Sequence, residues 1–109
     1  MLFRSLIADA SNHRIQQVDV QTGTVVKCFG KYGTSKGEFS FPVDVCLDEQ
    51  HRIVVTEQLK NHRIQVMTQE EETITMFGDS GPLKLNFPRS CIPYKNMFVV
   101  ADGSNNCIK

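Results

Sequence analysis

Asn12-His13-Arg14-Ile15-Gln16 is repeated residue for residue as Asn61-His62-Arg63-Ile64-Gln65, 49 positions further along the 109-residue chain. The string begins a third time at Asn105, after 44 more positions. Phe29-Gly30 likewise returns as Phe77-Gly78, a shift of 48 positions. Landmarks that keep one order and one period identify a repeat protein, so the repeat decides the architecture before any local propensity is considered.

The repeating unit is filled with short runs that are typical of β-strands. In the one complete unit these runs are residues 43–47, 52–57, 62–68 and 73–77. Each is rich in Val, Ile, Thr or Phe and is bounded by Gly, Asp, Asn or Gln. Four strands in a unit of this length are the content of one blade of a β-propeller. No segment has a helical period, so we expect an all-β fold.

Details of these runs predict how the sheets pack. Ile53-Val54-Val55 and residues 97–101 are apolar at consecutive positions, as in strands that are covered on both faces. In the first copy the apolar phase slips between Ile15 and Val18, which predicts a β-bulge near Gln16-Gln17. Four phenylalanines keep fixed places in the repeat and are expected in the core: Phe29, Phe41, Phe77 and Phe87.

A Pro-x-x-Val start, an apolar strand that ends in Ala-Asp and a following Asn-His-Arg-Ile-Gln together resemble the NHL repeat of six-bladed propellers. The resemblance covers nearly all of the chain. Three features depart from the family pattern: Glu57 stands where Asp is usual, Asp44 replaces a first-strand Gly, and residues 105–108 read Asn-Asn-Cys-Ile. This last variant resembles the propellers of tripartite-motif and RING-type proteins.

We therefore expect a partial, open β-propeller of four-stranded antiparallel blades from a six-bladed parent. Residues 1–30 would form three strands of one blade, the first starting at Phe3; residues 31–78 would form a complete blade with its leading crossover loop, and residues 79–109 the start of a third. Six blades would need about 270 residues, so the chain corresponds to a fragment of about two and a third blades. The remaining blades of the parent are expected partners, because closure is what removes the sheet edges of a propeller.

Composition sets broad limits on function. Lys and Arg total 12 and Asp and Glu total 12, so the net charge gives no bulk attraction to nucleic acid or to a membrane, and we expect no DNA or membrane partner. Residues 1–7 are too short for a signal peptide and include Arg4, and no stretch is long enough to span a bilayer. We expect a cytoplasmic protein with buried free thiols rather than a disulfide framework at its four cysteines: Cys28, Cys46, Cys91 and Cys107.

Strand order decides which loops share a face of an up-and-down blade. One face, the crossover face, would carry the second-to-third turns and the fourth-to-first crossovers, which are residues 9–13, 30–42, 57–62, 78–88 and 102–105. The opposite face would carry residues 20–24, 48–52, 68–73 and 94–97, and it is acidic.

The crossover face holds the candidate binding residues. Single-stranded RNA requires cations for its phosphates and an aromatic plane for a base, and this face offers Lys31, Tyr32, Lys36, Lys60, Lys84 and Arg89. The same face carries five acids, so its formal charge is not positive: Asp9, Glu38, Glu57, Asp79 and Asp102. On sequence alone, solvated loop lysines are the simpler interpretation.

The polar residues of the repeated string recur with the scaffold, which is unlike a residue needed once for chemistry. We expect structural roles, with Asn at the turn, His and Arg bonded to neighbouring loops and Ile in the core: Asn12, His13, Arg14, Asn61, His62, Arg63 and Asn105. A phosphate contact from Arg14 or Arg63 remains an alternative.

The sequence gives no support for catalysis. The inner strands, within residues 43–48 and 89–94, contain Asp44 and no histidine, so we expect no catalytic residue, metal site or cofactor. The resemblance implies a noncatalytic module that binds RNA or a protein partner. It would serve a post-transcriptional regulator or a ubiquitin ligase whose activity lies in a separate RING domain. The alternative is part of a metal-dependent propeller hydrolase or lyase.

Overall fold

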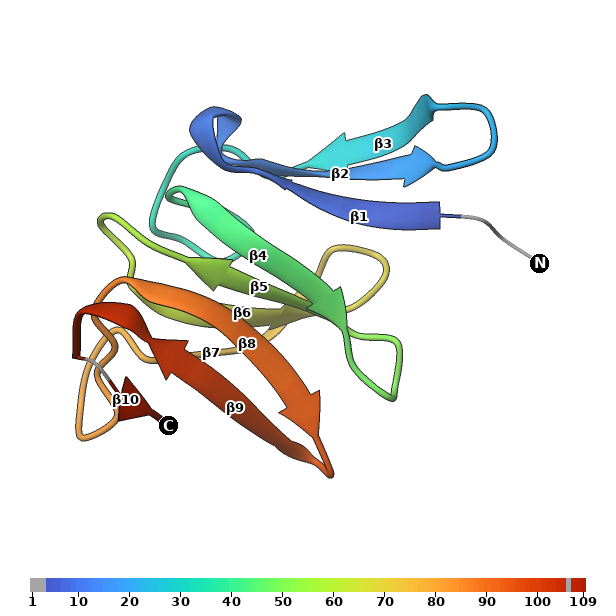
Figure 1. Cartoon of the computed structure of the whole chain (residues 1–109). Helices are drawn as coiled ribbons and strands as arrows, with labels where there is room; N and C mark the ends of the chain where they lie inside the picture. Colours follow the sequence, from blue (N-terminus) through green and yellow to red (C-terminus); the bar gives the residue numbers. More distant parts are fainter. Residues whose placement is uncertain (1–3, 106) are drawn as a thin grey trace.

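The computed structural model describes residues 4–105 and 107–109, in which ten strands form three antiparallel sheets (Figure 1). The N-terminal sheet consists of β1 (Arg4–Asp9), β2 (Arg14–Asp19) and β3 (Thr24–Phe29). The middle sheet consists of β4 (Pro42–Leu47), β5 (Ile53–Glu57), β6 (Arg63–Met67) and β7 (Thr73–Phe77). The C-terminal sheet consists of β8 (Pro88–Tyr94), β9 (Met97–Asp102) and β10 (Cys107–Ile108).

The architecture confirms the expected all-β, open propeller arrangement, with each sheet packed face to face on the next (Figure 1). The four strands expected in the middle unit are present, with boundaries that differ by at most one residue at each end. The expected start at Phe3 and the Asn106 position of the third string lie outside the described residues. The only helical turns in the described part are two 3₁₀ segments, η1 (Ala10–Asn12) and η2 (Gly103–Asn105). No described helix is long and apolar enough to cross a bilayer.

The predicted bulge is confirmed, since the pairing of β2 with β3 shifts register between Gln17 and Val18. The middle sheet has the same irregularity between Val66 and Met67, where β6 pairs with β7. A bulge at the same place in two sheets belongs to the repeat, and it increases the twist of the outer strands there.

Two apolar cores lie between neighbouring sheets. The first joins Ile15 and Phe29 of the N-terminal sheet to Ile53 and Val55 of the middle sheet, with Phe39 from the crossover loop. The second core joins the middle sheet to the C-terminal sheet and is formed by Val54, Ile64, Leu85, Cys91 and Val100. Because Ile53 and Val55 face one core and Val54 faces the other, β5 is covered on both faces, as its consecutive apolar residues predicted.

The expected burial of the phenylalanines and cysteines is only partly correct. Phe29 is buried, but Phe87 is 41% exposed at the end of its crossover. All four cysteines are free thiols, but Cys28 and Cys107 are exposed. Cys28 is exposed because β3 turns the adjacent Phe29 toward the middle sheet, and neighbouring strand residues point to opposite faces. Cys107 lies on the two-residue edge strand β10.

Burial and nearby carboxylates act on the other two thiols. Burial, with a smaller effect of Asp44 and Asp48, raises the pKa of Cys46 to about 11. Burial also raises the pKa of Cys91 to about 12, with smaller contributions from Cys46 and Asp44. Both groups are therefore neutral thiols at physiological pH.

The connections divide between two ends of the sheet stack as strand order predicted. Figure 1 shows the crossovers from β3 to β4 and from β7 to β8 at the same end as the β1–β2, β5–β6 and β9–β10 turns, at the left of the view. The remaining hairpin turns lie at the other end. We keep the names crossover face and opposite face for these two ends.

Candidate functional site

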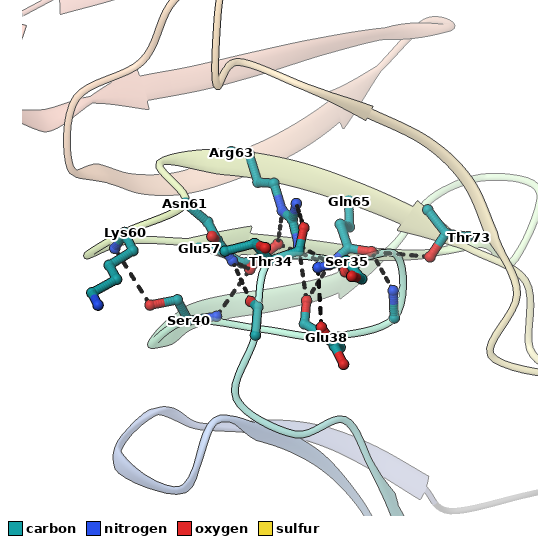
Figure 2. A network of polar contacts seen from close by, with 12 residues as sticks. Thr34, Ser35, Glu38, Ser40, Glu57, Lys60, Asn61, Arg63, Gln65 and Thr73 are labelled. Carbon is teal, nitrogen blue, oxygen red and sulfur yellow. Dashed lines mark hydrogen bonds and ion pairs between the residues drawn. The ribbon is translucent and has the colours of Figure 1, made fainter.

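The repeated string builds a buried polar network around one carboxylate, Glu57, which is fully buried at the end of β5 (Figure 2). The Ser40 amide and Asn61 Nδ2 donate to Glu57 Oε1 at 3.0 and 2.6 Å. Arg63 Nε and Gln65 Nε2 donate to Oε2 at 2.7 and 2.9 Å. These donors come from the crossover and from β6 or the turn before it, so one carboxylate joins both to β5.

Arg63 extends this network onto the crossover backbone. Its Nη1 donates to the Thr34 carbonyl at 2.7 Å, and its Nη2 donates to the carbonyls of Ser35 and Glu38 at 3.1 and 2.9 Å. Gln65 adds a bond from Nε2 to the same Glu38 carbonyl at 2.7 Å. Every guanidinium nitrogen of Arg63 is thus bonded inside the chain and the side chain is 3% exposed. In this arrangement the guanidinium group is committed to the crossover backbone and to Glu57, which favours the structural role expected for Arg63.

Asp9 holds the equivalent place in the N-terminal sheet, where it is more open. Asn12 Nδ2, Arg14 Nε and Gln16 Nε2 donate to Asp9 Oδ2 at 3.0, 2.9 and 2.9 Å. Hydrogen bonds from Asn12, Gln16 and Arg14 hold the pKa of Asp9 below its usual value. Arg14 is 40% exposed and no hydrogen bond from its Nη atoms is found within the described residues, so it is more accessible than Arg63.

Asp102 is the third carboxylate of the series and is 1% exposed. It accepts from the Asn86 amide at 2.7 Å and from Asn105 Nδ2 at 2.7 Å. Lys109 Nζ lies 2.9 Å from Asp102 Oδ2. Burial acts to raise the pKa of Asp102, but the bonds from Asn86, Asn105 and Lys109 outweigh it and lower that pKa. Lys109 therefore supplies the cation that arginine supplies in the other two copies.

The histidines of the string bind the residue that precedes each inner strand. His13 Nδ1 accepts the Phe41 amide proton at 2.9 Å, and His62 Nδ1 accepts that of Phe87 at 3.0 Å. Both histidines have left-handed backbone angles, φ 54° and 43°. The His62 ring meets the Phe87 ring edge-on at 4.7 Å. Burial, and then the charge of Lys84, lowers the pKa of His62.

On the crossover face, the structure brings two of the predicted binding residues, Tyr32 and Lys60, together. Tyr32 is 50% exposed, and Lys60 Nζ lies 5.9 Å from the centre of its ring, although the two residues come from different loops. The His13 ring lies edge-on to Tyr32 at 4.9 Å. Lys31 Nζ lies 3.7 Å from Glu38 Oε2 and is otherwise exposed. A cation and an accessible aromatic plane are therefore adjacent here.

Lys60 also shares a surface hollow with Lys84, which is lined further by Thr34, Asn61, His62, Arg63 and Asp79. Arg89 lies apart, in a second hollow with Gln58 and Phe87. Lys36 is exposed and contributes to neither hollow. Of the six predicted residues, Tyr32 and Lys84 thus lie beside Lys60, Lys31 is the sequence neighbour of Tyr32, and Lys36 and Arg89 lie outside this group.

The charge of the crossover face changes once these contacts are counted. Asp9, Glu57 and Asp102 accept several bonds each from the motif and are neutralised by Arg14, Arg63 and Lys109. Of the acids counted on this face in the sequence, only Glu38 and Asp79 are outside the motif. Against these two stand five cations that the motif does not use: Lys31, Lys36, Lys60, Lys84 and Arg89.

Sequence reasoning missed this positive balance because it counted every acid equally. The equivalent positions of Asp9, Glu57 and Asp102 in the repeat could have shown that these three acids belong to the scaffold and do not add free negative charge to the face. It also missed three apolar side chains that are exposed on the crossover face: Leu59 at 42%, Leu83 at 60% and Phe87 at 41%.

The described residues contain no cluster of three or more His, Cys, Asp or Glu side chains that could hold a metal ion. Asp44, the acid expected near the channel, accepts from the Cys91 amide at 3.4 Å and so links two inner strands.

Comparison with known proteins agrees with this geometry. Residues 39–67, which run from the crossover through β6, match the NHL repeat. The protein named brain tumor from Drosophila melanogaster is 36% identical over 80 residues, which is 73% of this chain. The chain spans 7% of the length of that relative.

Proposed function

Because residues 39–67 are an NHL repeat set in a stack of antiparallel sheets, we propose that the chain is a noncatalytic recognition module that binds single-stranded RNA through its crossover face. The module would act in a cytoplasmic post-transcriptional regulator. Any ubiquitin ligase activity would belong to a separate RING domain.

The observation that carries this proposal is the excess of free cations around an exposed aromatic ring. Lys60 lies over Tyr32 and shares a hollow with Lys84, while the motif acids are neutralised below the surface. Lysines that track phosphates beside an aromatic side chain on which a base stacks are the combination found in single-strand binding surfaces.

A protein partner is the second candidate, favoured by a separate observation. Leu59, Leu83 and Phe87 are exposed on the same face, and protein interfaces combine apolar anchors with a polar rim. Binding of a protein through these side chains would respond to Leu83→Ser and be insensitive to salt.

The opposite face supplies matched controls for the RNA test. Tyr94 is 51% exposed, against 50% for Tyr32, and Lys95 lies 5.2 Å from the Tyr94 ring centre, as Lys60 lies 5.9 Å from Tyr32. The test compares Tyr32→Ala with Tyr94→Ala and the pair Lys60→Ala, Lys84→Ala with Lys95→Ala. Affinity for a labelled single-stranded RNA is measured by fluorescence anisotropy across a salt series.

We expect Tyr32→Ala to weaken RNA binding by about 1–3 kcal/mol, as loss of one stacked base does. The double lysine variant should reduce the slope of log K against log salt by about 1.4, since each phosphate on a single strand contributes about 0.7. The controls should change neither quantity. Equal RNA affinity in the wild type and the double variant would reject the crossover face as the RNA site.

A further inference from the structure

The hollow that Lys60 shares with Lys84 lies between the turn before β6 and the crossover from β7 to β8. Both lysines are exposed, and the hydrogen bonds found for them within residues 4–105 and 107–109 involve only their backbone atoms. Figure 2 shows the Lys60 side chain directed away from the network around Glu57. Two ammonium groups from different loops are therefore free to bind a ligand at one hollow.

His62 adds a neutral donor to these two cations. Its Nδ1 accepts the Phe87 amide proton at 3.0 Å, so the proton of the neutral ring is on Nε2. Burial, and then the charge of Lys84, lowers the pKa of His62, which keeps the ring neutral at physiological pH. The half-buried ring lines this hollow and a second one beside it, in both cases together with Lys84. Among the described residues, no acceptor is found for its Nε2.

The charged surroundings of the His62 ring favour an anion. The other charged residues that line the hollow are Lys60, Lys84, Arg63 and Asp79. Arg63 is bonded to Glu57 and to the crossover backbone. In the described part of the chain, Asp79 forms an ion pair with neither lysine. Two free cations thus face one acid, and the net charge that remains is positive.

Both lysines depart from the repeat, whereas the scaffold residues keep to it. The position before the repeated string holds Ser11 in the first copy and Lys60 in the second. The position before the buried apolar residue of each crossover holds Glu38 in the first crossover and Lys84 in the second. The scaffold therefore needs a cation at neither place, and the two changes meet at the same hollow.

His13 is the matched histidine that lacks these changes. Its Nδ1 accepts the Phe41 amide proton at 2.9 Å, so its Nε2 also carries the ring proton. The two equivalent positions of its copy hold Ser11 and Glu38, and the Glu38 carboxylate already accepts the Ser35 amide. A histidine with the same backbone bond and without the two cations thus serves as an internal reference.

We propose that Lys60, Lys84 and His62 together bind one phosphate group in this hollow, with His62 donating from Nε2 as a neutral imidazole. Hydrogen bonds from ammonium groups to phosphate oxygens are charge-assisted and strong. The inference rests on the proposed function in that a phosphodiester of single-stranded RNA is the expected source of the group. A residue of the repeated string then has a second role as a ligand-binding residue, in one copy and not in the other.

The first test titrates inorganic phosphate into the protein at about pH 7.5, where the imidazole is neutral, with ionic strength held constant by chloride. The ring nitrogens of His13, His51 and His62 are followed by 15N NMR. We expect a saturable shift of His62 Nε2, which keeps its proton, and no shift at His13 or at His51. A histidine that only holds the scaffold has no contact with the added anion and does not respond.

Variants then assign the donors. Lys84→Ala should weaken phosphate binding at least about tenfold, since it removes a charge-assisted bond. His62→Asn keeps an acceptor for the Phe87 amide but has no donor at the position of Nε2, and it should weaken binding about two- to tenfold. Lys95→Ala is the matched control, because Lys95 also lies beside an exposed aromatic ring but on the opposite face. Circular dichroism should show the same β-sheet spectrum in all variants.

A single-stranded RNA with a 5′-hydroxyl end carries only phosphodiesters and should shift the same His62 resonance. Fluorescence anisotropy with this RNA tests the proposed function separately. RNA binding without any response of His62 to RNA or to phosphate overturns this inference and leaves the proposed function intact. A response to phosphate without RNA binding supports the phosphate site and rejects RNA as its ligand. Equal phosphate shifts at His62 and His13, or a shift that persists in the Lys60→Ala, Lys84→Ala variant, overturn the site.

Discussion

One position of the repeat holds a carboxylate in all three sheets, and its surroundings differ each time. Glu57 is enclosed by two loops and four donors, whereas the Asp9 side chain is 24% exposed and its donors among the described residues come from its own turn and from β2. Asp102 replaces the arginine partner with Lys109. The repeated string therefore specifies which side chains bond to the carboxylate. The neighbouring crossover loop decides how far that carboxylate is shielded from solvent.

The first prediction concerns the buried carboxylate. Glu57→Gln leaves Arg63 buried without a counter-charge, and removal of one partner from a buried pair costs about 3–5 kcal/mol. We expect a loss of unfolding free energy of about 3 kcal/mol, measured by urea denaturation. Asp9→Asn is the matched control and should cost clearly less, because Arg14 remains hydrated. Equal losses in the two variants would show that burial does not set the strength of this motif.

The second prediction concerns pH. The pKa of His62 is lowered in the folded chain by burial and by Lys84, so the unfolded chain, with an ordinary value of about 6.5, binds a proton more readily. Stability from this group is therefore complete above pH ~6.5 and is lost as the pH falls toward the lower folded pKa. Protonation of Nδ1 would also break its bond from the Phe87 amide.

The measurement is the unfolding midpoint at about pH 7.5 and about pH 5.5 in the wild type and in His62→Asn. Asparagine tolerates the left-handed backbone of this position and offers an acceptor that does not titrate. The drop in midpoint on acidification should be smaller in the variant. An identical drop would assign the pH dependence to other groups.

At the scale of elements, each crossover is anchored by one apolar side chain placed over a glycine. Phe39 covers Gly30 in the first crossover, and Leu85 covers Gly78 in the second. Both glycines have positive φ, 99° and 102°, and a Cβ at either would clash with the anchor. The Phe-Gly landmark in the sequence thus records a close approach between the end of an outer strand and the crossover that follows it.

The third prediction tests this anchor by comparing Gly30→Ala with Gly23→Ala. Gly23 also has positive φ, 73°, but no heavy atom lies within 4 Å of its would-be Cβ. Both variants carry a backbone strain of about 1–2 kcal/mol. Gly30→Ala should lose about 1–3 kcal/mol more, because Phe39 must move. Thermal unfolding gives the comparison, and a smaller loss in Gly30→Ala than in Gly23→Ala would contradict the anchor.

At the scale of the whole molecule, the sheets are held together by apolar cores and by bonds between loops of neighbouring sheets. Cys46 and Cys91 lie where the middle and C-terminal sheets meet, and Cys46 Sγ donates to the Cys91 carbonyl at 3.4 Å. Their thiols therefore report whether the two sheets stay packed.

The fourth prediction concerns the reactivity of the Cys46 and Cys91 thiols. With pKa values of about 11 and about 12, both thiols should resist an Ellman reagent at about pH 8 until denaturant is added, because the thiolate is the reactive form. The exposed Cys107 should react at once and serves as the internal reference. Rapid reaction of Cys46 in the native protein would mean that the C-terminal sheet detaches.

Much of the fold could be predicted from sequence, because strand length, turn residues and repeat period are local properties. The candidate binding residues could also be picked out from the sequence, but which of them lie next to one another could not. Tyr32 and Lys60 are 28 positions apart and meet only because a crossover folds over the next turn. The exposure of Phe87 was missed for a similar reason. Its position in the repeat is a sequence property, whereas its burial depends on which other segments pack over its ring.

The sequence by itself determined the repeat, the strands within it and the chemistry of each motif position, because these follow from periodicity and from backbone preference. Only the tertiary structure decided which charges remain on the surface. Whether a carboxylate attracts a ligand or is neutralised depends on donors from other loops, and those distances arise when the sheets stack.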